Sequence, residues 1–293
     1  PPTSRCSSAA SDVYKRQTVI GSVNLDIVAK AARLPAPGET VTGAELYRYP
    51  GGKGANQALA AKRLGADVAL IARVGDDAAA DEALALLRDD GVDLTQCVTV
   101  PGVPTGTALI AVAPSGENQI VVAPGANRHL APNDLEVPQS DALICQLEVP
   151  VDTVAKAASQ FGGFLSVNLA PAARIDVAVL QRADLVIVNE TESAWYGETL
   201  QACNGIVATT RGAGRATLER DGELIAESRP PVVDSIDATG AGDTFTAALT
   251  VALIEGRQPQ VALEFACAAG AAATTKLGAQ PSLPLRGEVT SDG

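Results

Sequence analysis

The chain has 293 residues, of which 46% are apolar and 19% are charged, and its formal net charge is −12. No apolar run approaches the length of a membrane-spanning helix, so we predict a soluble protein that does not enter a membrane, built as one large domain or one domain with a small appendage. The negative charge would repel nucleic-acid backbones, and no cluster of Lys and Arg offsets it, which argues against nucleic acid as a partner.

The cysteines and the single histidine narrow the chemistry further. Five cysteines lie far apart and form no C-x-x-C pair, which argues against a disulfide framework and against a zinc site. We therefore expect the reducing cytoplasm. His129 lies in a Pro/Asn/Gly-rich stretch and is more simply a loop residue than a catalytic base.

Residues 1–17 are set apart from the rest of the chain. Ser7 to Gln17 read SSAASDVYKRQ, which is the translation of a transposon adapter used in preparing sequencing libraries. The segment also lacks the apolar centre of a targeting signal. We predict a non-native tail over 1–17 and one folded domain over 18–293.

From Thr18 onward, strand-like and helix-like segments alternate. A buried strand stops at Gly21, the helical pattern ANQALAAKRLG ends at Gly65, and DVALIARVG forms a second strand before an acidic helix start. The series continues through DALICQLE, VDTVAKAASQFG, GFLSVNLAP and ADLVIVNETE to two Ala-rich helices over Asp243–Glu255 and Gln260–Lys276. This order predicts an α/β fold, with a mostly parallel sheet between helices and ligands beyond the carboxyl ends of the strands.

Two stretches interrupt the alternation. Residues at about 27–49 and 104–123 show short period-two runs separated by Pro and Gly turns, which is typical of β-hairpins. We expect the two hairpins to form a small sheet that acts as a lid over the main domain.

The stretch DATGAGDTF, Asp237 to Phe245, combines an anion site with an acid. Consecutive N–H groups from Gly240, Ala241 and Gly242, placed before a helix, form a donor surface suited to a phosphate. Asp243 would repel that phosphate unless it takes a proton from the group that attacks it. We therefore predict that Asp243 is a catalytic base.

Nine motifs occur in the order found in one enzyme family. They are GSVNLD, PGETVTG, GGKGANQA, PTGTALI, QLE, VNETE, TTRGAG, DATGAGDTF and GAQPSLP, and they cover nearly all of Thr18 to Leu285. In these motifs the chain resembles the ribokinase-like carbohydrate kinases of the PfkB family. The resemblance implies a ribokinase-like fold, transfer of the γ-phosphate of ATP to a primary hydroxyl of a sugar with D-ribose as the first candidate, and a homodimer formed through the lid sheet.

The segment GGKGANQ lies after the first lid hairpin and lacks the Walker A pattern. A turn followed by a helix cap would explain it, but its glycines also let backbone approach a sugar, to which Lys53 and Asn56 can donate. Asn24 and Asp26 can supply paired acceptors for a diol, although an Asn/Asp turn has the same composition. By resemblance, the sugar site is lined by Asn24, Asp26, Gly52, Lys53, Asn56, Glu148 and Asp243.

The resemblance also assigns the nucleotide and metal sites. Asn189 and Glu192 match positions that influence Mg²⁺ and phosphate, Glu192 through water, although an ordinary acidic helix start would look the same. The nucleotide is expected on Asn189, Thr209, Thr210, Arg211, Gly212, Ala213, Gly214, Gly242 and Cys267. A K⁺ ion is expected on Asp237, Thr239, Ala273, Lys276, Gly278 and Ser282, mostly through backbone carbonyls.

Other functions remain open at this stage. The sugar could be deoxyribose, fructose or a nucleoside, because few hydroxyl contacts separate them. A sugar sensor without activity would keep the fold, although the intact Asp243 argues against it. The sequence does not favour a nucleotide-dependent dehydrogenase, because the first strand is not followed by G-x-G-x-x-G. The segment between Trp195 and Ile206 is about a helix shorter than is usual in the family, so we expect an altered nucleotide side.

Overall fold

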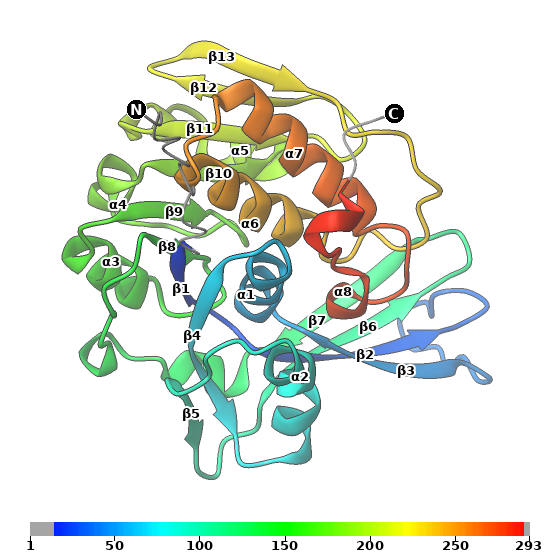
Figure 1. The fold of residues 1–293 in the computed structure, drawn as a ribbon. Helices are drawn as coiled ribbons and strands as arrows, with labels where there is room; N and C mark the ends of the chain where they lie inside the picture. The colour runs from blue at the N-terminus through cyan, green and yellow to red at the C-terminus, as the bar shows by residue number, and fades with distance from the viewer. Residues whose placement is uncertain (1–14, 290–293) are drawn as a thin grey trace, which may run out of the picture.

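The computed structural model describes residues 15–289. Strands and helices alternate along the chain, and nine of the strands form one sheet (Figure 1). Seven neighbouring strands, counted across the sheet from the edge strand β5 through β4, β1, β8, β9 and β10 to β11, pair in parallel. Strands β12 and β13 extend the sheet as an antiparallel hairpin. In spatial order the strands are β13 (Glu223–Ser228), β12 (Ala216–Arg220), β11 (Ile206–Thr210), β10 (Leu185–Asn189), β9 (Phe164–Asn168), β8 (Ala142–Cys145), β1 (Arg16–Ile20), β4 (Asp67–Gly75) and β5 (Cys97–Val100). The predicted mostly parallel sheet is confirmed.

Helices cover both faces of this sheet because alternate residues of each strand are apolar on opposite sides. On β10, Leu185 and Ile187 belong to one buried cluster, and Val186 and Val188 belong to the other. The first cluster lies under α1 (Lys53–Arg63), α2 (Ala78–Asp89), α6 (Ala241–Ile254) and α7 (Pro259–Ala272); the second lies under α3 (Val151–Gln160), α4 (Val177–Arg182) and α5 (Glu190–Tyr196).

The last Ala-rich helix, α7, ends at Ala272 and does not reach the predicted Lys276. The hydroxyls of Thr274 and Thr275 donate to the carbonyls of Ala271 and Ala272, which satisfies two acceptors that a continuing helix would have used. The short helix α8 (Ala279–Ser282) and the turns η1 (Gly125–His129), η2 (Pro132–Asp134), η3 (Gly197–Ala202) and η4 (Arg286–Glu288) complete the fold. The shortened segment before β11 contains only η3.

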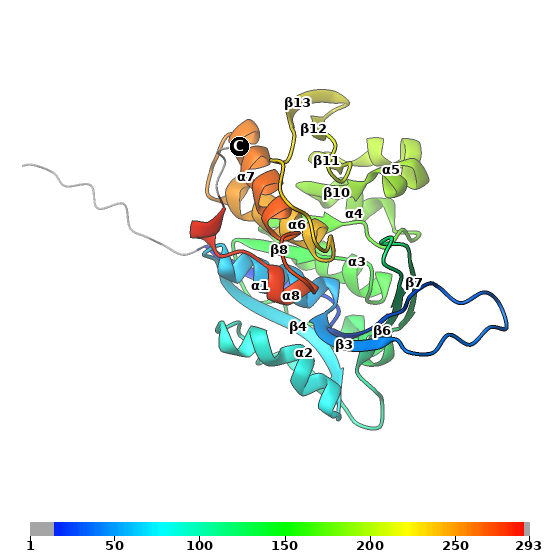
Figure 2. The ribbon, with the colours of Figure 1, turned by 90° about the vertical axis from the view of Figure 1, so that its right-hand side faces the viewer.

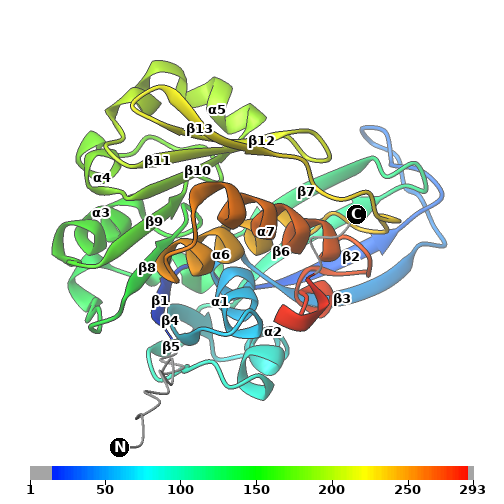
Figure 3. The same ribbon diagram turned by 45° about the horizontal axis from the view of Figure 1, so that its top comes forward.

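The two predicted hairpins form a second, four-stranded sheet that projects from the main body (Figures 2 and 3). Its order is β3 (Glu45–Gly51), β2 (Asn24–Lys30), β6 (Gly106–Val112) and β7 (Asn118–Ala123), with β2 and β6 parallel and the other pairs antiparallel. Because β2 begins at Asn24, the GSVNLD motif leads directly from the central sheet into this lid sheet. Asn24 and Asp26 therefore lie at the base of the lid.

Strand β1 includes Arg16 and Gln17, two residues of the segment that we assigned to a non-native tail. The backbone N–H of Arg16 donates to the Asp141 side chain, and Gln17 is aligned with Val68 on β4. Main-chain pairing accepts almost any side chain, so the strand extends ahead of Thr18 whatever the origin of these residues. Residues 1–14 of the tail lie outside the described part of the chain.

A search of the described helices for membrane spans gave no candidate: each is too short or too polar to cross a bilayer.

Candidate active site

The first group of site residues lies where β2 leaves the main body. Asp26 is buried above Gly51, and a Cβ atom on Gly51 would lie 2.4 Å from the Asp26 Oδ2 atom, so the glycine makes room for the carboxyl. Burial raises the pKa of Asp26 to about 7, and the nearby charges of Glu148, Asp243 and Asp237 raise it as well. Gly52 caps α1 with a φ of 90°, in the region that favours glycine.

Asn24 is held by a residue that the sequence analysis did not select. The backbone N–H of Val23 donates to Asn127 Oδ1 at 2.9 Å, so Asn127 must turn its Nδ2 toward Asn24 Oδ1, which lies 2.8 Å away. Asn24 therefore offers its Nδ2 donor beside the Asp26 acceptor. Because one lone pair of Asn24 Oδ1 is already used by protein, the paired acceptors for a diol stay a prediction.

Lys53 brings a positive charge among three carboxylates at the start of α1. Burial lowers the pKa of Lys53, but the charges of Asp243, Glu148 and Glu192 raise it more, and the net shift is upward. Glu148 accepts from the backbone N–H of Lys53 at 3.2 Å and from the Ser22 hydroxyl. Lys53 therefore stays positively charged, between the residues predicted to bind the sugar and Glu192.

Asp243 is buried at the first turn of α6 and faces α1. Its Oδ2 accepts from Asn56 Nδ2 at 2.8 Å, and its Oδ1 accepts from Gln57 Nε2 at 2.9 Å. The Oδ1 atom of Asn56 is buried and has no partner among the described residues. Asn56 donates one amide hydrogen to Asp243, which leaves its second hydrogen for the predicted bond to the sugar.

Two further buried amides behind Asp243 were missed. Gln146 donates to Gln57 Oε1 at 2.7 Å, and Asn168 accepts from Gln57 Nε2 at 3.2 Å. Gln146 follows β8 and Asn168 ends β9, so parallel strands bring both to the carboxyl edge of the sheet. A polar residue at each strand end was the available signal.

The start of α6, where an anion site is predicted, has free backbone donors, but they are not all the predicted ones. Gly240 adopts a φ of 84° at the N-cap of α6, and its carbonyl accepts from the Thr244 N–H. The N–H of Ala241 is used by the Ala238 carbonyl at 3.2 Å, whereas those of Gly240, Gly242 and Asp243 donate to no acceptor in the described part of the chain. The donors open to a phosphate are therefore Gly240, Gly242 and Asp243, and Ala241 is not one of them.

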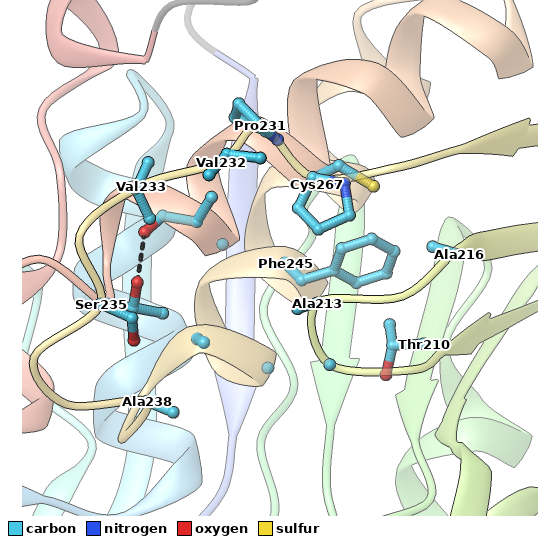
Figure 4. Close-up of a pocket in the computed structure, with 17 residues that line it drawn as sticks. Thr210, Ala213, Ala216, Pro231, Val232, Val233, Ser235, Ala238, Phe245 and Cys267 are labelled. Atoms are coloured by element: carbon cyan, nitrogen blue, oxygen red, sulfur yellow. Dashed lines mark hydrogen bonds between the residues drawn. The ribbon is translucent and has the colours of Figure 1, made fainter. Parts of the chain in front are cut away.

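A largely apolar cavity of about 420 Å³ adjoins these donors (Figure 4). Five predicted nucleotide residues line it: Thr210, Gly212, Ala213, Gly242 and Cys267. Thr209, Arg211, Gly214 and Asn189 are not among its lining residues. The lining residues that were not predicted are Ala216, Pro230, Pro231, Val232, Val233, Ser235, Ala238, Phe245, Gly270, Ala271 and Thr274. Most of them are small or apolar and lie outside the motifs, so no local pattern marks them.

Asn189 and Glu192 form a capping box at the start of α5. Asn189 Oδ1 accepts from the Glu192 N–H, and Glu192 Oε2 accepts from the Asn189 N–H, each at 2.8 Å. This is the ordinary helix start that we weighed against a magnesium role, and it leaves Glu192 Oε1 available. Among residues 15–289, no group of three His, Cys, Asp or Glu side chains could hold a metal by itself.

The loop expected to hold K⁺ closes around Asp237. Its Oδ1 accepts from the N–H and hydroxyl of Thr239, and its Oδ2 accepts from the Gly278 N–H at 2.9 Å. Burial raises the pKa of Asp237, but these hydrogen bonds lower it more, so the net shift is downward. Within the described residues, the carbonyls of Thr239, Ala273, Lys276 and Gly278 accept no hydrogen bond, so their oxygens are free of protein donors; the K⁺ site stays a prediction. The Ser282 hydroxyl donates to the Ala279 carbonyl, which leaves the predicted role of Ser282 untested.

Comparison with known proteins places this geometry in a family. The model of the pfkB family of carbohydrate kinases matches residues 15–286. The chain belongs to this family. Its carbohydrate-kinase class confirms the predicted type of enzyme, and the match, like strand β1, starts ahead of Thr18.

Individual pfkB-family members align along nearly the whole chain. The chain is 38% identical to the ribokinase of Haemophilus influenzae, with 94% of this chain and 97% of that protein covered. It is similar in structure to the ribokinase of Thermotoga maritima, with a TM-score of 0.86, 33% identity and coverage of 94% and 98%. The ribokinase of Arabidopsis thaliana, solved with ribose and ATP, aligns with a TM-score of 0.80, 29% identity and coverage of 94% and 97%.

Proposed function

We propose that this chain transfers the γ-phosphate of ATP to the primary hydroxyl of D-ribose and releases ADP and ribose 5-phosphate. The observation that carries the proposal is the position of Asp243. It is buried beside the sugar residues on α1, and its own N–H stands with those of Gly240 and Gly242 at the edge of the apolar cavity. The likeness to ribokinases supports ribose as the sugar.

The chain supplies position, charge and a proton acceptor. Asn24, Asp26 and Asn56 orient the sugar, so that its primary hydroxyl faces Asp243. The hydroxyl oxygen forms a bond to the γ-phosphorus, the bond from that phosphorus to the ADP oxygen breaks, and the hydroxyl proton passes to Asp243. The N–H donors at the start of α6 and the Lys53 ammonium stabilise the negative charge on the transferring group.

Mg²⁺ fits this site as an ion carried by the ATP phosphates. The Oε1 atom of Glu192 would accept a hydrogen bond from a magnesium-bound water. Burial raises the pKa of Glu192; the N–H of Asn189 and the charge of Lys53 lower it, the charge of Asp243 raises it, and the net shift is upward. When bound, Mg²⁺ neutralises phosphate charge.

K⁺ suits the loop around Asp237, which leads directly into the α6 donors. We expect several-fold faster turnover in KCl than in NaCl at matched ionic strength, because an ion on the Thr239 and Gly278 carbonyls would order the backbone before Gly240. The comparison should be repeated with Asp237→Asn, in which the difference between the salts should shrink. Equal wild-type rates in the two salts would remove K⁺ from the proposal.

The substrate is tested by measuring ADP release over a panel of ribose, 2-deoxyribose, fructose and adenosine. We expect the highest kcat/KM for ribose, because a buried site built for a hydroxyl rejects an analogue that lacks it. A higher kcat/KM for another sugar would replace ribose but keep the reaction. No ADP with any sugar, together with measurable ribose binding, would identify a sensor and overturn the kinase function.

The setting of the reaction follows from more general features. Cys97, Cys145, Cys203 and Cys267 are free thiols, which suits the reducing cytoplasm. We also propose a homodimer that forms through the exposed face of the lid sheet.

A further inference from the structure

A row of buried amides supports Asp243 from the side away from solvent. Gln57 is fully buried on α1, and its Nε2 lies 2.9 Å from Asp243 Oδ1. Gln146, also fully buried, donates to Gln57 Oε1 at 2.7 Å. Because an ionised carboxylate only accepts hydrogen bonds, Gln57 must turn its nitrogen toward Asp243 and its oxygen toward Gln146. The Asp243 carboxylate thus determines the orientation of the Gln57 amide, and the Gln57 amide determines that of Gln146.

We propose that Gln57 is a positioning residue for Asp243 and that Gln146 holds Gln57 in place. This inference rests on the proposed function, in which Asp243 accepts the hydroxyl proton. The χ2 torsion of an aspartate, about the bond to its carboxyl carbon, has broad energy minima, so a single hydrogen bond would leave the carboxylate free to rotate. Gln57 on Oδ1 and Asn56 on Oδ2 together fix its plane and leave the remaining lone pairs for the sugar hydroxyl.

The two donors differ in their relation to the substrate. Asn56 keeps 4% of its surface exposed, and its buried Oδ1 has no partner among the described residues, so Asn56 is the donor that can also contact the sugar. Gln57 has no exposed surface, and both atoms of its amide are engaged with protein groups. Gln57 therefore acts on the reaction only through Asp243, which predicts an effect on turnover without an effect on binding.

Gly21 leaves the space that Gln146 fills. A Cβ atom on Gly21 would lie 2.0 Å from Gln146 Oε1 and 2.7 Å from the Cα of Gly54. The strand β1 ends immediately before this glycine, so the absence of a side chain lets the amide row pass between β1 and α1. The row is thus part of the junction between the central sheet and the sugar-binding helix.

The test compares kcat and KM for three variants. Gln57→Leu removes the donor at similar volume, and we expect kcat to fall about 10- to 100-fold while the KM values for ribose and ATP stay within about threefold. Gln146→Leu should lower kcat less, since Gln57 keeps its bond to Asp243. Thr250→Val is the matched control. It removes a buried hydroxyl elsewhere on α6, which is hydrogen-bonded to Ser166 on β9, and kcat and KM should stay within about twofold of wild type.

Gln57→Glu should change the pH dependence of kcat, which a general loss of stability would not do. Its new carboxyl can donate to Asp243 only while protonated, so kcat should fall as pH rises, relative to wild type. This profile decides the case if Gln57→Leu fails to fold. Wild-type kcat in Gln57→Leu, or an unchanged pH profile in Gln57→Glu, would overturn the positioning role.

Asp243→Asn, assayed in parallel, separates the two levels of inference. If it turns over at the wild-type rate, the proton-acceptor role fails, and the positioning role fails with it. If it is inactive while Gln57→Leu is fully active, only the positioning role fails.

Discussion

At the scale of single residues, the site is defined by acids that protein folding brings together. Asp26, Glu148 and Asp243 come from separate segments and lie close enough to raise the pKa of Asp26, with Lys53 as the nearby cation. Burying several carboxylates with one ammonium is unfavourable without a ligand. The arrangement is therefore suited to a sugar that donates hydroxyl groups and a nucleotide that brings its own cations.

Asp243→Asn is the direct test of the proton acceptor. We expect kcat to fall about 10²- to 10⁴-fold, because the amide cannot take the hydroxyl proton. The amide nitrogen also faces a donor on either Asn56 or Gln57, so one supporting hydrogen bond is lost. Calorimetry should still give ribose affinity within about threefold. A kcat within about threefold of wild type would reduce Asp243 to a residue of the helix start.

Asp26 should make sugar binding depend on pH. Its pKa is raised to about 7, first by burial and then by the charges of Glu148 and Asp243, and only the ionised form accepts two hydroxyls. At saturating ATP, the ribose KM should rise about tenfold per pH unit below about pH 7 and level off above it. Asp26→Asn should bind more weakly and lack this slope. A flat wild-type profile would contradict the assignment.

The same residue has a predictable effect on stability. The folded protein keeps the Asp26 proton up to about pH 7, whereas the unfolded chain loses it near 3.8. The stability associated with the neutral carboxyl is therefore present at low pH and lost as pH rises through about 7. Asp26→Asn should raise the melting temperature of the ligand-free protein at about pH 8 more than at about pH 4.

At the scale of elements, β1 contains a side chain that does not suit its position. Gln17 is fully buried, and neither its Oε1 nor its Nε2 atom has a partner among the described residues. An apolar side chain is the usual occupant of a central parallel strand. The Gln17 amide therefore stays unsatisfied inside the sheet.

Gln17→Leu should therefore stabilise the protein by about 1–3 kcal/mol, because it removes two unsatisfied buried polar atoms at similar volume. Thr18→Val is the matched control: the Thr18 hydroxyl already donates to Ser140 at 3.1 Å, so no gain is expected there. Urea unfolding of the three proteins gives the comparison. A loss of stability in Gln17→Leu would mean that the amide is satisfied in solution.

At the scale of the whole molecule, the lid sheet leaves apolar surface uncovered. Ile120, Val121 and Val122 follow one another on the edge strand β7, with 54%, 65% and 48% of their surfaces exposed, so neither face of that strand is covered. Leu109 on β6 is also half exposed. Monomeric proteins rarely expose such a strand without charges or proline to protect it.

We expect the chain to form a dimer in sedimentation equilibrium, with this surface buried between two lids. Val121→Glu should shift the protein toward monomer, because it places a charge within the apolar contact. Val261→Glu, at a half-exposed site on α7 outside the lid sheet, is the control and should leave the assembly unchanged. A wild-type monomer at micromolar concentration would contradict the proposed dimer.

Local sequence patterns were enough to predict the layers of the fold and the chemistry of the main motifs. Apolar periodicity distinguishes strands from helices, and both lid hairpins could be predicted from turn residues. Asp243 could be selected because an acid directly after small residues at a helix start is unusual. These signals are local, so neighbouring residues are enough to detect them.

The pairing of polar atoms could not be predicted, because the partners come from distant parts of the chain. Asn127 restrains Asn24 across 103 positions, and Gln57 reaches Asp243 across 186, distances over which no local pattern operates. The apolar nucleotide cavity has the same cause, since Phe245 and Ala271 become its walls only when α6 packs against α7. Local chemistry names the reactive groups, but long-range packing determines their partners and their pKa values.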